Sequence, residues 1–272
     1  MIHFAPAKIN LGLHVLERRP DGYHNLQTVM VPTGLCDLLE ITPLNEEGKA
    51  FRFEQTGIPL EEGSGVNLCV KAWRLVTRER SVPPLFIHLH KQIPVGAGLG
   101  GGSSDATHTI LGINQLMGNP FSADTLHGMA ARLGSDCAFF LHDRAMLAEG
   151  RGEILTPAGV DLRGTWLILF HPGVHLSTAE AYRGISPSTD RTDLRTLLEQ
   201  PMERWKGTVQ NDFEKTVFRK HPVIGEMKAS IYAAGAVYAS LSGSGSAIYG
   251  LFESPPVLTG ELARHILWKG RL

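Results

Sequence analysis

Residues 94–105 read PVGAGLGGGSSD, a segment in which glycines are followed by two serines and an aspartate. The apolar residues 85–90 before it predict a strand, and Ile110, Leu111 and Ile113 after it predict a helix. Glycine lets a backbone bend tightly and approach an anion, and the amides that open a helix point at that anion. The segment therefore predicts a strand, a phosphate-binding loop and a helix, capped by Ser103 or Ser104 and carrying Asp105 in its first turn.

Other glycine loops have contexts that this sequence lacks. Gly96, Gly98 and Gly101 match the spacing of the dinucleotide fingerprint, but that fold needs a second parallel strand after the helix. Here residues 119–122 and a second predicted helix follow instead. A Walker A loop needs Gly-Lys-Ser/Thr, and a protein kinase needs separate lysine and catalytic-loop motifs; neither occurs. A flexible turn before a capped helix remains the structural alternative.

Composition limits the classes of partner. The chain has 272 residues, a formal net charge of -1 and three widely spaced cysteines without a C-x-x-C pair. This charge does not favour nucleic-acid or anionic-membrane binding, and the cysteines disfavour a disulfide framework or a zinc site. No segment has the length of a transmembrane helix. We expect a soluble, cytoplasmic protein.

The order of the predicted elements indicates an α+β fold, because helices and strands are grouped in blocks rather than alternating. Half-buried strands are expected at 9–16 and 27–31, and a helix at 122–133 ends at Gly134. A hairpin at 145–155 and a strand at 166–170 follow, and we place the domain boundary at 155/156. The last predicted strands are joined through residues 242–246, and the tail from residue 253 has no assigned element.

Three motifs together resemble the GHMP kinases, the superfamily of galactokinase, homoserine kinase and mevalonate kinase. Residues 94–106 resemble its phosphate loop, residues 5–11 (APAKINL) its N-terminal motif, and residues 241–247 (LSGSGSA) its C-terminal glycine motif. The resemblance implies a ribosomal-protein-S5-like ATP-binding domain at 1–155 and a ferredoxin-like substrate domain at 156–272.

Residues 21–28 (DGYHNLQT) and 171–174 (HPGV) are similar to one branch, the 4-diphosphocytidyl-2-C-methyl-D-erythritol kinases. That resemblance implies ATP-dependent phosphorylation of the 2-hydroxyl of a cytidine diphosphate methylerythritol, in non-mevalonate isoprenoid biosynthesis, by a monomer or homodimer. It also implies Mg²⁺, although no dedicated protein cage for the ion is visible. A GHMP kinase with another acceptor, or a nucleotide-binding module without catalysis, remains an alternative.

The resemblance implies two catalytic residues. Asp136 becomes the base that accepts the hydroxyl proton, and it also contacts the substrate. Lys8 becomes its cationic neighbour, because a lysine buried in a strand needs an acid or a phosphate beside it. Taken alone, an aspartate after a glycine more often caps a turn or helix, as Asp136 could, and a strand lysine such as Lys8 more often faces water.

The same resemblance implies residues for the acceptor. Tyr23 and Tyr182 stack on cytosine, His24 reads its edge and Asn10 orients the substrate near the hydroxyl. Gly243 and Ser244 face the substrate or the transferred phosphate, although residues 242–246 could also be an ordinary hairpin turn. Ordinary packing is the alternative for the tyrosines.

Nucleotide contacts are expected from three positions outside the glycine segment and from the segment itself. Leu68, Asn67 and Lys91 match adenine-side positions, although Asn67 could cap a helix and Lys91 could be a solvated strand end. The phosphates are expected to contact Pro94, Gly96, Gly98, Leu99, Gly100, Gly101, Gly102, Ser103 and Ser104.

Overall fold

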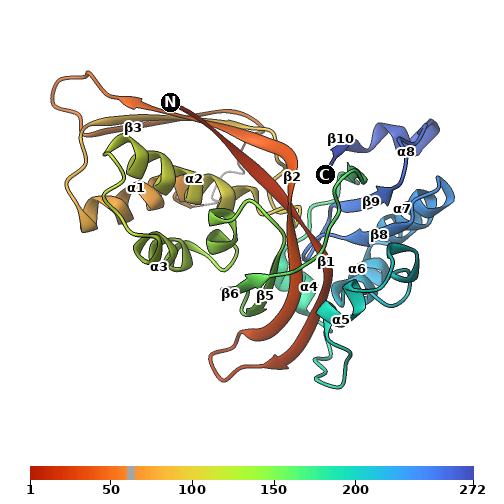
Figure 1. Cartoon of the computed structure of the whole chain (residues 1–272). Coiled ribbons are helices and arrows are strands. Elements are labelled where there is room, and N and C mark those ends of the chain that lie inside the picture. Colours follow the sequence, from red (N-terminus) through yellow and green to blue (C-terminus); the bar gives the residue numbers. More distant parts are fainter. Residues whose placement is uncertain (60–64) are drawn as a thin grey trace. The chain divides into compact units, whose positions relative to one another are not determined.

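The computed structural model describes residues 1–59 and 65–272, which form two compact units (Figure 1). Unit 1 comprises residues 1–7, 35–95 and 100–143, and unit 2 comprises residues 8–34, 96–99 and 144–272. Each unit is discontinuous in sequence, so neither coincides with a single cut in the chain. The boundary at 155/156 between an ATP domain and a substrate domain stays a prediction.

Unit 1 places helices against the buried side of a sheet (Figure 1). Strand β3 (Phe51–Gly57) pairs in parallel with β4 (Leu85–Lys91), which pairs antiparallel with the second half of β2 (His24–Pro43). Its helical elements are α1 (Leu68–Glu79), α2 (Gly101–Leu116), α3 (Ala123–Leu133) and η1 (Cys137–Leu141). Alternate residues of β4 are buried, the last of them Lys91, so one face of this strand faces the core.

Unit 2 is built around a four-stranded antiparallel sheet in the order β10-β7-β9-β8. These strands are β7 (Trp166–Phe170), β8 (Tyr238–Leu241), β9 (Ile248–Phe252) and β10 (Ile266–Arg271). The shorter strands β5 (Met146–Gly150) and β6 (Ile154–Pro157) form the predicted hairpin, and β5 pairs with the first half of β2. The tail that the sequence left unassigned supplies β10, which pairs with β7.

Helices of unit 2 complete its core. They are α4 (Thr178–Tyr182), α5 (Leu194–Leu198), η2 (Met202–Arg204), α6 (Phe213–Lys220), α7 (Pro222–Ala233) and α8 (Gly260–Arg264). Ile231 of α7 packs with Ile168, Phe170 and Ile248 of the sheet. Strand β9 is buried along its whole length, as a central strand covered on both faces must be.

Strand β1 (Ile2–Arg18) corrects one expectation. Residues 9–16 were expected to form a half-buried strand, but every side chain from residue 7 to residue 15 is buried. The polar face of this strand, with Lys8, Asn10 and His14, is therefore inside the protein. Burial of polar side chains costs free energy unless their hydrogen bonds are satisfied, which makes this face a candidate for function.

None of the helices in residues 1–59 and 65–272 has the length and apolar character required to cross a membrane.

The packing of β9 against α7 leaves no room for a side chain at Gly250. A Cβ atom there would lie 2.6 Å from Cγ2 of Ile231. We expect Gly250→Ala to lower the free energy of unfolding by about 1–3 kcal/mol through overpacking. Gly128 is an interior residue of α3 with nothing within 4 Å of its Cβ position, and Gly128→Ala should raise that free energy by about 0.5–1 kcal/mol. Urea denaturation followed by circular dichroism measures both; equal stability of the two variants would contradict this packing.

Candidate functional site

Lys8 lies inside β1 with only 3% of its surface exposed. Its Nζ donates hydrogen bonds to Oδ1 of Asn10 at 2.6 Å and to the carbonyl oxygen of Gly98 at 3.0 Å. The alternative that Lys8 faces water is therefore wrong. Ile9 and Leu11 point to the opposite face of the strand and are also buried, so both faces of β1 are covered at this position.

Asn10 holds Lys8 in place. Its Nδ2 donates to Oγ1 of Thr28 at 3.0 Å, and Thr28 donates to the carbonyl of Gly12 at 2.6 Å. The hydroxyl of Tyr249 donates to the backbone oxygen of Asn10 at 2.7 Å. These bonds fix the amide orientation so that Oδ1 accepts from the ammonium. The expected contact of Asn10 with a substrate stays a prediction.

The tip of the glycine loop, residues 96–99, meets the C-terminal glycine motif within unit 2. Oγ of Ser242 donates to the carbonyl of Gly98 at 2.9 Å, and the amide of Ala247 donates to the carbonyl of Ala97 at 3.0 Å. Gly98 has φ of +76°, and a Cβ atom there would lie 2.0 Å from the carbonyl oxygen of Ser242. Only glycine permits this approach. Leu99 is buried and accepts from the amide of Lys8.

The C-terminal glycine motif is the turn between β8 and β9, so the predicted connection of two strands through residues 242–246 is confirmed. Its shape depends on Asn211, whose Nδ2 donates to the carbonyls of Leu241 at 2.9 Å and Gly243 at 2.8 Å. Ser244 is half-buried, with its Oγ 3.4 Å from Oγ1 of Thr178. Sequence reasoning missed Asn211, which lies between predicted elements with no periodic pattern to indicate burial. Whether Gly243 and Ser244 face a substrate stays a prediction.

Two of the three residues expected at the cytosine ring lie together. The rings of His24 and Tyr182 are stacked, with centroids 4.8 Å apart and planes inclined by 22°. Phe213 meets the ring of Tyr182 edge to face at 4.8 Å. Burial lowers the pKa of His24 below its usual range, with a smaller contribution from Arg18, which favours the neutral imidazole.

Tyr23 has a different environment from the stacked pair. It is 55% exposed, and the guanidinium of Arg151 lies 5.1 Å from the centre of its ring. The ring therefore already has a cation over it, while much of its surface remains exposed to solvent. A cytosine ring that stacks on Tyr182 has to extend or open the existing stack with His24.

Asp136 lies in unit 1 immediately before η1. Gly134 ends α3 as predicted, and Asp136 occupies the N-cap position of η1 without a side-chain capping bond, within the described part of the chain. Its side chain therefore does not cap η1, and its role as a base stays a prediction. Thr107 of α2 secures this region, since its Oγ1 donates to the carbonyls of Ser103 at 2.9 Å and Cys137 at 2.8 Å. Thr107 was not identified from the sequence.

Helix α2 begins earlier than predicted. Gly100, with φ of +71°, is its N-cap residue and Gly101 its first residue, so neither Ser103 nor Ser104 caps it. Asp105 is consequently outside the first turn, and its carboxyl is buried. Glycine is required at position 100 because few other residues adopt this left-handed conformation. Because α2 begins at Gly101, the amides of Gly101, Gly102 and Ser103 are its first three and have no acceptor within the helix.

Two residues expected near adenine begin α1. Asn67 caps this helix, because its Oδ1 accepts from the amide of Cys69 at 2.8 Å, while its Nδ2 donates to Oε1 of Gln55 at 3.2 Å. The capping alternative for Asn67 is confirmed. Leu68 comes within 3.4 Å of the Cβ position of Gly102. The start of α1 thus lies beside the start of α2, in the unit that carries both.

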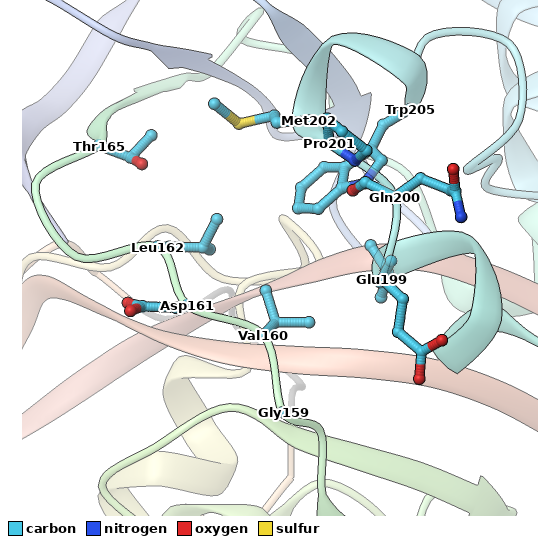
Figure 2. Close-up of a pocket in the computed structure, with 11 residues that line it drawn as sticks. Gly159, Val160, Asp161, Leu162, Thr165, Glu199, Gln200, Pro201, Met202 and Trp205 are labelled. Carbon is cyan, nitrogen blue, oxygen red and sulfur yellow. The ribbon is translucent and has the colours of Figure 1, made fainter.

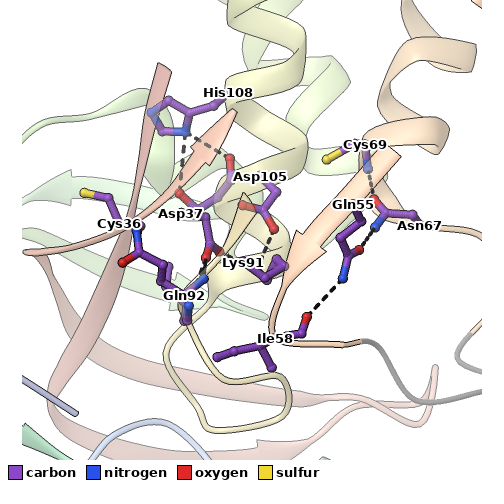
Figure 3. A network of polar contacts seen from close by, with 12 residues as sticks. Cys36, Asp37, Gln55, Ile58, Asn67, Cys69, Lys91, Gln92, Asp105 and His108 are labelled. Carbon is purple, nitrogen blue, oxygen red and sulfur yellow. Dashed lines mark hydrogen bonds and ion pairs between the residues drawn. The ribbon is translucent and has the colours of Figure 1, made fainter. Parts of the chain in front are cut away.

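Lys91 is not a solvated strand end. It is 3% exposed, and its Nζ forms ion pairs with Asp37 and, at 2.7 Å, with Asp105 (Figure 3). Burial alone would lower the pKa of Lys91, but the two carboxylates more than offset this and raise it. Burial raises the pKa of Asp105 to about 7; Lys91 opposes this rise, and the charge of Asp37 adds to it. The expected contact of Lys91 with ATP stays a prediction.

Unit 2 also contains two pockets of about 410 Å³ each. One is formed by the segments around Leu162 and Trp205, and Figure 2 shows its lining, which includes none of the predicted site residues. The other is lined in part by Asn211 and Asp212, whose segment shapes the glycine turn. In residues 1–59 and 65–272, no group of three or more His, Cys, Asp or Glu is arranged to hold a metal ion.

Comparison with known proteins gives consistent results across the chain. The family model described as "GHMP kinases N terminal domain" matches residues 67–144, and "GHMP kinases C terminal" matches residues 187–258. A 4-diphosphocytidyl-2-C-methyl-D-erythritol kinase of Bacteroides thetaiotaomicron is 46% identical over 100% of both chains. One of Cytophaga hutchinsonii is 45% identical over 94% of both chains.

A solved structure agrees with these relatives. The crystal structure of a 4-(cytidine 5'-diphospho)-2C-methyl-D-erythritol kinase superposes with a TM-score of 0.78 at 34% sequence identity, covering 94% of this chain and 91% of that chain. The expected α+β class is confirmed. The chain therefore belongs to the GHMP kinases and, within them, to the family of 4-diphosphocytidyl-2-C-methyl-D-erythritol kinases.

Proposed function

We propose that this chain transfers the γ-phosphoryl group of ATP to the 2-hydroxyl of 4-diphosphocytidyl-2-C-methyl-D-erythritol. The bond between the γ-phosphorus and its bridging oxygen breaks, the hydroxyl oxygen bonds to that phosphorus, and ADP and the 2-phosphate are the products. We place the reaction in the cytoplasm, in the non-mevalonate route to isoprenoid precursors. The names of the relatives that match the whole chain support this acceptor.

The observation that carries the proposal is the position of the Lys8 ammonium. It is buried in unit 2 beside Gly98 of the phosphate loop and 3.3 Å from the Cβ position of Gly243. Phosphoryl transfer depends on positioning and on neutralising charge at the transferred group. A fixed, buried cation next to two glycine-rich turns is suited to that task, because its field is screened little by water.

Asp136 is the proposed base. Its carboxylate would accept the proton of the 2-hydroxyl as that oxygen attacks phosphorus. Lys8 and Asp136 belong to different compact units, and their pairing is part of the proposal. A lysine beside Asp136 would favour the ionised carboxylate that a base requires.

ATP would be held by backbone more than by side chains. The first amides of α2, those of Gly101, Gly102 and Ser103, have no partner within the helix, and the helix dipole favours an anion there. This arrangement fits a triphosphate. Mg²⁺ would be carried by the phosphates with several waters, as is usual for nucleotide-bound magnesium.

The acceptor would be recognised through its cytosine ring. Tyr182 offers an aromatic face that Phe213 holds from the edge, and neutral His24 beside it can donate and accept hydrogen bonds. Tyr23 supplies a second, exposed aromatic face. Aromatic rings that can stack on a base, together with one side chain that can form hydrogen bonds, suit cytosine, which is flat and carries an amino group and a carbonyl.

The reaction itself is testable with a panel of acceptors. The protein is incubated with magnesium-ATP and, separately, with the cytidyl methylerythritol, mevalonate, homoserine and galactose, while ADP formation is followed. We expect turnover with the cytidyl compound alone, and phosphorus NMR should locate the new phosphate on the 2-hydroxyl. Faster turnover with any other acceptor would refute the proposed substrate.

The catalytic pair is tested by Lys8→Met and Asp136→Asn. Loss of the cation or of the base should lower kcat about 100-fold or more, with a smaller change in the KM for ATP. Lys71→Ala and Asp124→Asn are matched controls, since both residues are exposed on helices of unit 1. Steady-state kinetics give both constants, and near-normal kcat in either catalytic variant would remove that residue from the mechanism.

Stacking on the base is tested at position 182. We expect Tyr182→Ala to raise the KM for the cytidyl substrate about 10- to 100-fold, since stacking of a base on an aromatic ring contributes about 1–3 kcal/mol. Tyr182→Phe keeps the ring and should stay close to the parent protein. The KM for ATP serves as the internal control in both variants. An unchanged acceptor KM in Tyr182→Ala would rule out a stacking role.

A further inference from the structure

The end of β4 and the start of α2 flank the glycine loop, and a buried cluster of three charged side chains joins them. Asp37 comes from β2, Lys91 from β4 and Asp105 from α2 (Figure 3), and all three belong to unit 1. Their exposed fractions are 0%, 3% and 3%. None of them was assigned this connection from the sequence.

Asp37 fixes the strand side of the loop. One carboxylate oxygen, Oδ1, accepts from the amides of Gln92 at 2.5 Å and Ile93 at 2.9 Å, and the other accepts from Nζ of Lys91. Three consecutive residues are thus bonded to one side chain just as the strand ends. Charge-assisted bonds of this kind are stronger than bonds between neutral groups.

Asp105 fixes the helix side. Its Oδ2 accepts from Nζ of Lys91 at 2.7 Å, while its Oδ1 is buried with no hydrogen-bond partner. Nζ of Lys91 also lies 3.2 Å from the Cβ position of Gly101, the first residue of α2. The cluster therefore lies directly under the helix start that supplies the phosphate-facing amides.

A cluster made only for stability would not need these charges. Buried ion pairs carry a large desolvation cost, and apolar side chains of similar size often stabilise a fold as well or better. An ion pair does, however, define one geometry, because each donor and acceptor must be satisfied. Because the cluster joins the two ends of the glycine loop, the geometry that it defines is that of the loop.

We propose that Asp37, Lys91 and Asp105 form a positioning device that sets the conformation of the phosphate loop, and hence the affinity for a nucleoside triphosphate, without contacting the nucleotide. The proposal rests on the proposed kinase function and adds residues that position its donor site. In this proposal the Lys91 ammonium serves the cluster, because it is buried between two carboxyl groups.

The protonation state of the cluster follows from its surroundings. The titratable groups that face Asp105 are Asp37 from β2, Lys91 from β4 and Cys69 from α1. Burial raises the pKa of the Cys69 thiol, which stays protonated, and Lys91 stays charged. Asp105, with its pKa near 7, therefore holds a proton at mildly acidic pH and loses it above neutrality. Ionisation adds a negative charge next to the loop and should weaken the binding of an anion.

The central test uses Lys91→Met and the double variant Lys91→Met/Asp105→Asn, with binding of magnesium-ATP measured by calorimetry in the absence of any acceptor. Lys91→Met leaves two buried carboxyls without their cation and should lower both thermal stability and ATP affinity. Asp105→Asn in the second variant relieves the buried negative charge. We expect the double variant to regain stability while its Kd for ATP stays raised about 10-fold or more.

Ile41→Ala is the matched control. Ile41 is buried on the same strand as Asp37, and its truncation destabilises unit 1 without touching the cluster. We expect it to lower the melting temperature and leave the Kd for ATP unchanged. If ATP affinity instead followed the melting temperature across all three variants, the cluster would have only a structural role and the proposal would fail.

A pH series gives an independent readout. The Kd for ATP of the parent protein should rise more steeply above pH 7 than that of Asp105→Asn, which cannot ionise; parallel curves would contradict the proposal. Both proteins see the same ionisation of ATP, so that contribution cancels in the comparison. Because these measurements need no acceptor, they stand even if the acceptor panel assigns another substrate, which would refute only the proposed function.

Discussion

At position 98 the backbone has space for a hydrogen atom and nothing larger. The carbonyl oxygen of Ser242 occupies the place where a side chain would begin. The carbonyl oxygen of Gly98 accepts hydrogen bonds from both the Ser242 hydroxyl and the Lys8 ammonium. Three motifs that are far apart in the sequence therefore meet at one peptide group of unit 2. The arrangement of the candidate site in that unit depends on this close approach.

Local pattern predicted the parts of this arrangement well. The strand before the glycine loop, the helix after it, the end of α3 at Gly134 and the β5–β6 hairpin are all set by residues close to each other in sequence. The same pattern misjudged burial. Alternation in residues 9–16 indicated one solvated face, whereas that face is closed by the glycine turn and by Tyr249. Periodicity distinguishes two faces of a strand but does not show what covers the second.

The residues that sequence reasoning missed share a physical feature. Asp37, Thr107 and Asn211 act through hydrogen bonds to backbone or charged groups that are distant along the chain. Asp37 is 54 residues from Lys91, and Asn211 is 32 residues from Gly243. Such partners are fixed by the fold as a whole, so spacing carries no signal for them. The recognised motifs were visible because their glycines and polar residues are consecutive.

The two buried lysines show why environment, more than residue type, decides a role. Lys91 lies between two carboxyl groups that balance its charge, and its bonds all serve to join β4, β2 and α2. Lys8 donates to the amide oxygen of Asn10 and to the carbonyl oxygen of Gly98, and the second bond places its ammonium at the tip of the phosphate loop. A buried cation at that place is suited to act on a charged group that arrives. The location of each ammonium thus distinguishes a lysine that shapes the loop from one suited to chemistry beside it.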